Sequence, residues 1–274
     1  MAETIGLIAG NGRFPLLFAE AARREGLRVV AVAHRGETES EIERAVDALT
    51  WVRVGELGKI IRVFVAAGVR RAVMAGGIRK ARLFSGFRPD LRGAAFLARV
   101  RSFHDDALLR GIALELERDG IQIVSSTILL PSLVTREGVL GSVRPGRAEW
   151  KDIAVGFRVA KDVGRWDVGQ SVVVKNGIVL AIEGIEGTDA CILRGGELAR
   201  GGIVVVKVAK PEQDLRFDVP AAGPGTVAAM RAANGRVLAL EAGRTIVLER
   251  DEFLAAADAA SIAVVGVTEA TLPQ

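Results

Sequence analysis

Short apolar runs alternate with helical patterns through the first half of the chain. The runs at 4–9, 28–33, 51–54, 71–75 and 121–125 have the length and composition of strands. Apolar residues recur at helical spacing in the intervening stretches 16–25, 41–49, 55–67, 94–102 and 105–118. Because strands that alternate with helices form parallel sheets, the pattern predicts a Rossmann-like N-terminal α/β domain over residues 1–130.

The pattern changes after a segment with Pro131 and Pro145 near its ends, which is predicted as a linker over 131–147. Beyond it, Asn176-Gly177 separates two apolar runs and predicts a tight hairpin. A second hairpin is predicted about residues 241–243. Helices at 149–163, 226–233 and 251–260 and strands at 203–209 and 262–267 complete a distinct C-terminal α+β domain over 148–274.

Composition narrows the class of protein. Half of the 274 residues are hydrophobic, which suits α/β layers, and the net charge is only +4 with a pI near 9.6. No dense Lys/Arg block with interleaved aromatic residues occurs, so nucleic acid is not an expected partner. The charge is compatible with attraction to phosphates or to an anionic membrane surface.

Cysteine usage and the apolar runs bear on the compartment. Cys191 is the only cysteine, so an internal disulfide is impossible and a reducing compartment is expected. It is interpreted as a small buried residue. The N-terminus has no signal-peptide pattern, and no apolar run reaches spanning length. We expect a cytoplasmic protein.

Glycine-rich turns follow two of the predicted strands. Gly10-Asn11-Gly12 follows the first, and Gly76-Gly77, with Arg79 and Lys80, follows the strand at 71–75. Parallel sheets bind ligands at these carboxyl ends, where glycine lets backbone N–H groups approach a phosphate. A tight turn without a ligand is the alternative.

The first turn matches the dinucleotide fingerprint incompletely. Pro15 occupies the place of the third glycine, and His34-Arg35-Gly36 stands where an acid would bind a ribose hydroxyl. NAD is therefore disfavoured, whereas a nucleotide or another phosphate stays open.

A charged stretch from Lys210 to Pro220 concentrates candidate chemistry. Five charged residues lie within nine positions: Lys210, Glu212, Asp214, Arg216 and Asp218. Three carboxylates beside two cations suit a phosphorylated substrate with bound Mg²⁺, which prefers hard oxygen ligands. The alternative is a solvated surface loop.

Further acids lie near predicted helix starts. Thr188 is predicted to cap a helix, and Asp189 is either a first-turn acid or a partner, with Glu183 or Glu186, of the charged stretch. Asp105 is likewise predicted as a cap, and nothing completes a zinc set or a catalytic triad around His104.

Short motifs in this order resemble the LpxI family of UDP-2,3-diacylglucosamine pyrophosphatases over nearly the whole chain. They lie at 6–12 with Pro15, 55–60, 105–110, 164–170, 186–190 and 210–220. The resemblance implies hydrolysis of UDP-2,3-diacylglucosamine to lipid X and UMP in lipid A biosynthesis, with Mg²⁺ as cofactor. It also implies a substrate held between a Rossmann-like and a C-terminal domain. His104 and Ala221-Ala222-Gly223 depart from the family pattern.

Residue roles are predicted from the resemblance together with the chemistry of the residues themselves. Asp218 matches a functionally required acid, so it is expected to bind Mg²⁺ or orient water, with Asp189 and Asp214 as further metal ligands. Lys210 and Arg216 are expected to stabilise phosphate charge. The residues expected to bind substrate are Gly10, Asn11, Gly12, Gly76, Gly77, Gln170 and Thr188. A homodimer and a peripheral position on the inner membrane are further expectations.

Two alternatives belong to other classes. In an NADP-linked reductase, Arg35 would meet the 2′-phosphate, although Pro15 and the lack of a catalytic Tyr or Cys count against it. A non-catalytic nucleotide-binding regulator would bind without turnover, and it leaves the carboxylates of the second domain unexplained.

Overall fold

The computed structural model describes residues 2–78, 88–100 and 105–273. It contains two compact units: Met1–Pro131 with Asp214–Asp218, and Ser132–Gln213 with Val219–Gln274. The charged stretch, predicted within the C-terminal domain, is therefore divided, and its residues Asp214–Asp218 belong to the N-terminal unit. The predicted roles of Arg79, Lys80 and His104, and the side chain of Asp105, lie outside what is described.

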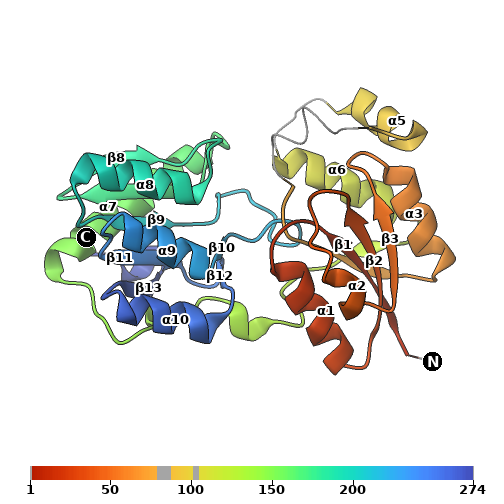
Figure 1. The fold of residues 1–274 in the computed structure, drawn as a ribbon. Coiled ribbons are helices and arrows are strands. Elements are labelled where there is room, and N and C mark those ends of the chain that lie inside the picture. The colour runs from red at the N-terminus through yellow and green to blue at the C-terminus, as the bar shows by residue number, and fades with distance from the viewer. Residues whose placement is uncertain (1, 79–87, 101–104, 274) are drawn as a thin grey trace. The chain divides into compact units, whose positions relative to one another are not determined.

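The sheet of the N-terminal unit is parallel throughout, with strand order β3-β2-β1-β4-β5 (Figure 1). This order confirms the Rossmann-like prediction, and β1 and β4 flank the point where the strand order reverses. The strands are β1 (Thr4–Ala9), β2 (Arg28–His34), β3 (Ala48–Val52), β4 (Arg71–Ala75) and β5 (Gln122–Ile123).

The helices of this unit follow the predicted alternation with one correction. They are α1 (Phe14–Arg24), α2 (Ile42–Ala45), α3 (Leu57–Ala66), α5 (Leu91–Arg99) and α6 (Asp105–Glu117). The single helix predicted over 41–49 is wrong, because α2 is one turn long and β3 begins at Ala48. Asp47 explains the change: its N–H donates to the Val29 carbonyl at 3.0 Å, and its carboxylate accepts from the Val29 N–H at 2.8 Å. These bonds attach the chain to β2.

The core of the N-terminal unit includes a residue from the charged stretch. Apolar side chains of the sheet pack with those of α3, α5 and α6, including the fully buried Phe64 and Leu116. Phe217 joins this cluster with an exposed fraction of 5%. The alternative of a wholly solvated loop is therefore wrong for this part of the stretch.

The C-terminal unit has a mixed sheet with strand order β6-β13-β11-β9-β7-β8. Strands β9, β11 and β13 are parallel, whereas β6, β7 and β8 add antiparallel pairings. These strands are β6 (Gly138–Val139), β7 (Ser171–Lys175), β8 (Ile178–Ile182), β9 (Val204–Lys207), β11 (Val237–Glu241) and β13 (Ala263–Val267). Strand β6 lies within the segment predicted as a linker, as does the 3-10 turn η1 (Pro131–Leu133).

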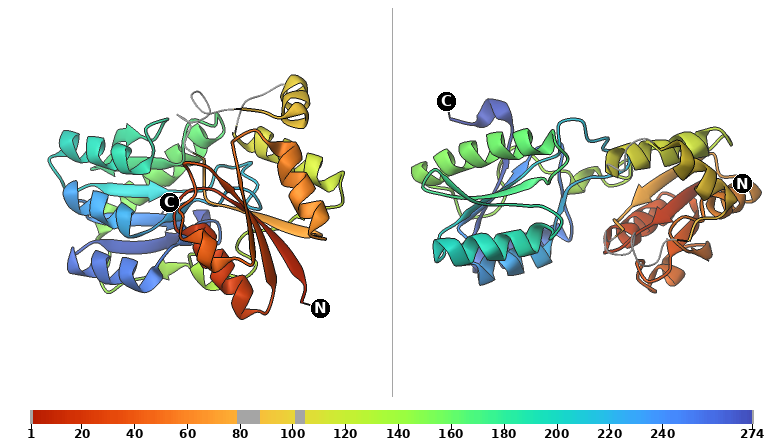
Figure 2. Two further views of the ribbon diagram at one scale, coloured as in Figure 1. Left: turned by 45° about the vertical axis from the view of Figure 1, so that its right-hand side comes forward. Right: turned by 90° about the horizontal axis from the view of Figure 1, so that it is seen from above.

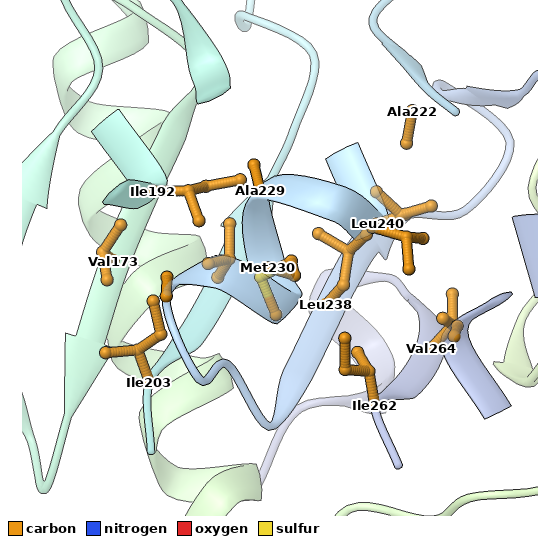
Figure 3. Packing of buried hydrophobic residues seen from close by; sticks show 14 of the residues in the cluster. Val173, Ile192, Ile203, Ala222, Ala229, Met230, Leu238, Leu240, Ile262 and Val264 are labelled. Carbon is orange, nitrogen blue, oxygen red and sulfur yellow. The ribbon is translucent and has the colours of Figure 1, made fainter. Parts of the chain in front are cut away.

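Helices cover both faces of this sheet (Figure 2). On one face, α7 packs over Val172, Val204 and Val206. On the other, helices pack over Val173, Val205 and Leu238, and Met230 of α9 fills the space between them (Figure 3). The helices are α7 (Arg147–Gly164), α8 (Thr188–Ala199), α9 (Pro224–Ala232) and α10 (Arg250–Ala259), and a 3-10 turn η2 spans Glu269–Thr271.

The first predicted hairpin is confirmed. Asn176 and Gly177 both have positive φ, 52° and 76°, as a type I′ turn requires. The Asp152 carboxylate of α7 accepts from both of their N–H groups, at 2.9 and 2.6 Å. The turn is thus held to the helix as well as by its own geometry.

The second predicted hairpin is wrong. Strand β11 pairs in parallel with β9 and β13, while β12 (Ile246–Val247) pairs in parallel with β10 (Ala221–Ala222) in a separate two-stranded sheet. The Thr245 hydroxyl donates to the Glu241 carbonyl at 2.8 Å and directs the chain away from β11. Since β9, α9, β11, α10 and β13 follow one another as strand, helix and parallel strand, much of this unit is α/β in character.

Candidate functional site

The two glycine turns of the N-terminal unit lie in contact at the carboxyl ends of β1 and β4. The Asn11 N–H donates to the Gly77 carbonyl at 2.8 Å, and the Gly77 N–H donates to Asn11 Oδ1 at 3.3 Å. A Cβ at Gly10 would overlap the Gly77 carbonyl oxygen, and one at Gly76 would overlap that of Asn11. Close approach of two backbones therefore requires these glycines, whereas the exposed Gly12 has open space around it.

Polar side chains lie beside the first turn. The Ala9 carbonyl accepts from Thr38 Oγ1 at 2.7 Å and from His34 Nδ1 at 3.0 Å. Asn11 Nδ2 donates to the buried Glu37 carboxylate at 3.4 Å. Burial lowers the pKa of His34, so the ring is neutral at pH 7 with its proton on Nδ1. These side chains hold the turn in place through hydrogen bonds. Only the His-x-x-Glu spacing that begins at the last residue of β2 could have indicated them.

The part of the charged stretch that belongs to this unit, Asp214–Asp218, is a single compact turn. The Asp214 carbonyl accepts from the N–H groups of Phe217 and Asp218, at 3.0 and 3.4 Å. The Asp214 carboxylate pairs with the Arg216 guanidinium at 2.7 Å, and this hydrogen bond lowers the pKa of Asp214. Two predicted site residues therefore neutralise each other, while Asp218 is partly exposed at the end of the turn.

An ion pair of the C-terminal unit, between the half-buried Lys161 and the buried Glu241, holds the residue just before the stretch. Lys161 of α7 donates to both Glu241 oxygens, at 2.6 and 2.7 Å, and to the Ala209 carbonyl at 2.8 Å. Glu241 also accepts from the Ala209 N–H at 2.8 Å. Burial lowers the pKa of Lys161, and the carboxylate opposes this shift. Lys210, the next residue, forms an ion pair with Asp167.

A second polar group lies on the opposite face of the same sheet edge. Lys207 Nζ donates to Thr188 Oγ1 at 3.0 Å, and the Thr188 hydroxyl donates to Glu183 at 2.9 Å. Ser171 lies between Glu183 and Lys207 across neighbouring strands. Lys207 and Glu183 are buried, with exposed fractions of 5% and 7%. Lys207 was missed, because it reads as the end of a buried strand.

The remaining predicted residues of this unit occupy the same edge. Thr188 is the first residue of α8, and the N-cap is Gly187, so the predicted capping role is wrong; its hydroxyl is directed to Glu183 and Lys207 instead. Asp189 is exposed in the first helical turn. The Gln170 carbonyl accepts from the Val208 N–H at 2.9 Å. Burial raises the pKa of Cys191 to about 12, in agreement with its predicted place in the core.

The predicted metal ligands are divided between the units: Asp214 and Asp218 belong to the N-terminal unit and Asp189 to the C-terminal unit. Within residues 2–78, 88–100 and 105–273, no group of three or more His, Cys, Asp or Glu side chains is arranged to hold a metal ion. No helix in these ranges is long and apolar enough to cross a membrane.

The chain is thus a two-unit α/β protein with polar groups gathered at an edge of each main sheet. Comparisons with known proteins identify its family. Residues 4–133 match the LpxI N-terminal domain and residues 136–265 match the LpxI C-terminal domain. A curated relative from Caulobacter vibrioides, UDP-2,3-diacylglucosamine pyrophosphatase LpxI, is 34% identical over 96% of this chain and 97% of its own length. The chain belongs to the LpxI family.

Similarity to solved structures is low. The biotin carboxylase domain of a thermophilic 2-oxoglutarate carboxylase is 13% identical with a TM-score of 0.28, over 63% of this chain and 35% of that one. The biotin carboxylase subunit of pyruvate carboxylase is 14% identical with a TM-score of 0.26, over 68% and 39%. Values this small support no conclusion about function.

Proposed function

We propose that this protein hydrolyses the pyrophosphate bond of UDP-2,3-diacylglucosamine, giving 2,3-diacylglucosamine 1-phosphate (lipid X) and UMP for lipid A biosynthesis. The observation that carries the proposal is the match to both LpxI domains, together with 34% identity to a pyrophosphatase over 96% of the chain. The same match favours this activity over an NADP-linked reductase that uses Arg35 and over a non-catalytic regulator.

Asp218 is the proposed catalytic carboxylate. It is partly exposed at the end of a hydrogen-bonded turn, so its oxygens can reach a substrate from a fixed backbone. An oxygen donor of this kind fits Mg²⁺, which takes one or two protein carboxylates and completes its shell with water and phosphate oxygens. Bound Mg²⁺ would supply charge neutralisation for the pyrophosphate. Asp218 would hold the ion or orient the attacking water.

The present contacts of the other proposed residues indicate how each could act. Asp214 is engaged by Arg216, which makes it a weaker candidate ligand than Asp189, and Asp189 is exposed in the first turn of α8. Lys210 and Arg216 would stabilise phosphate charge only by exchanging their Asp167 and Asp214 partners for substrate oxygens.

Substrate recognition is proposed for the two sheet edges. The turns that contain Gly10, Asn11, Gly12, Gly76 and Gly77 would hold the uridine nucleotide, because backbone groups and the carboxyl ends of parallel strands suit phosphates. Gln170 and Thr188, at the edge of the C-terminal sheet, are also proposed to bind substrate. Because the substrate is a membrane lipid, we also propose a cytoplasmic enzyme that works at the inner-membrane surface, as a homodimer.

The test is release of UMP from UDP-2,3-diacylglucosamine by the purified protein, with Mg²⁺ and with EDTA. We expect Mg²⁺-dependent formation of UMP and lipid X, and loss of turnover in a folded Asp218→Asn variant. Glu212→Gln, a change to an exposed carboxylate in the same stretch, is the matched control and should keep its activity. Absence of turnover by the wild-type protein would refute the function; full turnover by Asp218→Asn would refute only the assignment of Asp218.

A further inference from the structure

The second half of the charged stretch belongs to the N-terminal unit, although the chain on both sides of it belongs to the C-terminal unit. The chain therefore passes between the units at 131/132, at 213/214 and again at 218/219. Five residues, Asp214–Asp218, are placed on one unit by a chain that otherwise builds the other. Such a short excursion is ordered only if its own contacts outweigh the conformational entropy of fixing it.

Phe217 supplies the largest of these contacts. Its side chain is 5% exposed and packs in the same apolar cluster as Phe64 and Phe96 of the N-terminal unit. Burial of an aromatic side chain is a large favourable term for so short a segment. It also fixes the position of the next residue, because Asp218 is bonded directly to the anchored one.

The Asp214–Arg216 pair braces the same turn. Arg216 donates to the Asp214 carboxylate through both Nε and a terminal nitrogen, at 3.0 and 2.7 Å, and its guanidinium carbon lies 4.8 Å from the centre of the Phe217 ring. Arg110 and Glu117 of α6 are close enough to influence these two groups electrostatically. The Asp214 carboxylate, the Arg216 guanidinium and the Phe217 ring therefore form a single cluster beside the backbone that carries Asp218, with the guanidinium in contact with both of the others.

The beginning of the stretch is fixed separately. Ala209 is held at its N–H by Glu241 and at its carbonyl by Lys161, and Lys210 N–H donates to Gln213 Oε1 at 2.9 Å. The stretch thus has one attachment in each unit, at Ala209 and at Phe217.

We propose that Phe217, Asp214 and Arg216 are positioning residues, which attach Asp218 to the N-terminal unit so that this carboxylate acts from the unit that carries the glycine turns. The proposal rests on the hydrolytic function proposed above. It assigns Asp214 and Arg216 to the geometry of the turn instead of to direct contact with metal or phosphate.

Kinetics of Phe217→Ala test this proposal, with Phe96→Ala as the matched control. Both changes remove a ring from the same cluster, and Phe96 is 8% exposed. We expect kcat of folded Phe217→Ala to fall about 100-fold, because misplacement of a reacting group by an ångström has effects of that size. KM should change little, Phe217→Leu should restore most of kcat, and Phe96→Ala should keep kcat within about twofold. Equal kcat in Phe217→Ala and Phe96→Ala would overturn the proposal.

Hydrogen exchange gives a second test that does not depend on turnover. In the wild-type protein, the amides of Phe217 and Asp218 should be protected, because both donate to the Asp214 carbonyl. Phe217→Ala should remove this protection while the amides of β9 remain protected. Unchanged protection would refute anchoring by Phe217 even if the enzyme proves to act on a different substrate. Protection lost without any change in kcat would confine the role of Phe217 to structure and would also overturn the proposal.

Discussion

The groups in contact at the edges of the two sheets differ: backbone groups in the N-terminal unit and side chains in the C-terminal unit. In the N-terminal unit, the backbones of two turns meet at Gly10 and Gly76, where side chains are excluded. In the C-terminal unit, the edge is filled by side chains that pair with each other, the half-buried Lys161 with the buried Glu241 and the buried Lys207 with the half-buried Thr188. The first edge depends on the absence of side chains and the second on paired ones. An added side-chain atom should therefore destabilise the first edge, and removal of a charge should destabilise the second.

The largest expected effect is that of Gly76→Ala. The new Cβ would overlap the Asn11 carbonyl, and φ at this position is +77°, so we expect a loss of about 3–4 kcal/mol in the free energy of unfolding. Gly12→Ala is the control: its φ is +79°, but nothing lies within 4 Å, and the expected loss is about 1 kcal/mol. Urea unfolding measures both. Equal losses would mean that contact between the turns is unimportant.

Glu241→Gln should have the next largest effect. Removal of the charge leaves the half-buried Lys161 without its carboxylate, and breaking a pair that is largely shielded from water costs about 3 kcal/mol. The exposed pair Arg194–Glu186 is the comparison, and Glu186→Gln should cost only about 0.5 kcal/mol. Thermal unfolding of both variants measures the difference. A Glu241→Gln protein as stable as Glu186→Gln would show that the ion pair contributes nothing beyond the hydrogen bonds.

The smallest expected effect concerns pH. Burial lowers the pKa of His34 from its ordinary value of about 6.5, so near that pH the unfolded chain binds a proton that the folded protein does not. The free energy of unfolding should therefore fall as pH decreases below 6.5, by at most about 1.4 kcal/mol per pH unit from this group. His34→Gln should make this slope shallower between pH 6.5 and 5. Three carboxylates, Asp90, Asp214 and Glu186, also have lowered pKa values. Their contributions to the free energy of unfolding are lost only below pH 5, so they do not affect the slope between pH 6.5 and 5. An unchanged slope would contradict the buried neutral ring.

Local pattern was sufficient for the N-terminal sheet, apart from the start of β3, and for contact between its two turns. The apolar runs that became β1 and β4 needed only length and composition, and parallel strands bring their carboxyl ends together. The Asn176-Gly177 hairpin was equally predictable, because its turn requires those residue types.

Long-range contacts explain what the pattern missed. Phe217 lies in a stretch rich in charges, and its burial depends on a core made by residues at or before position 123. The false second hairpin has the same origin, since parallel partners from β9 and β13 took both sides of β11. Thr188 is a residue type typical of helix caps, yet its hydroxyl accepts from Lys207 and donates to Glu183 instead.

The excursion of Asp214–Asp218 also limits how this protein can be divided. A fragment that ends at Pro131 would lack the ring that completes its apolar cluster, and a fragment that starts at Ser132 would carry that ring with no cluster to receive it. Each half would expose apolar surface that the intact chain covers, which favours aggregation of the fragments. Recombination between relatives should therefore preserve function only when residues 214–218 are inherited together with the N-terminal half.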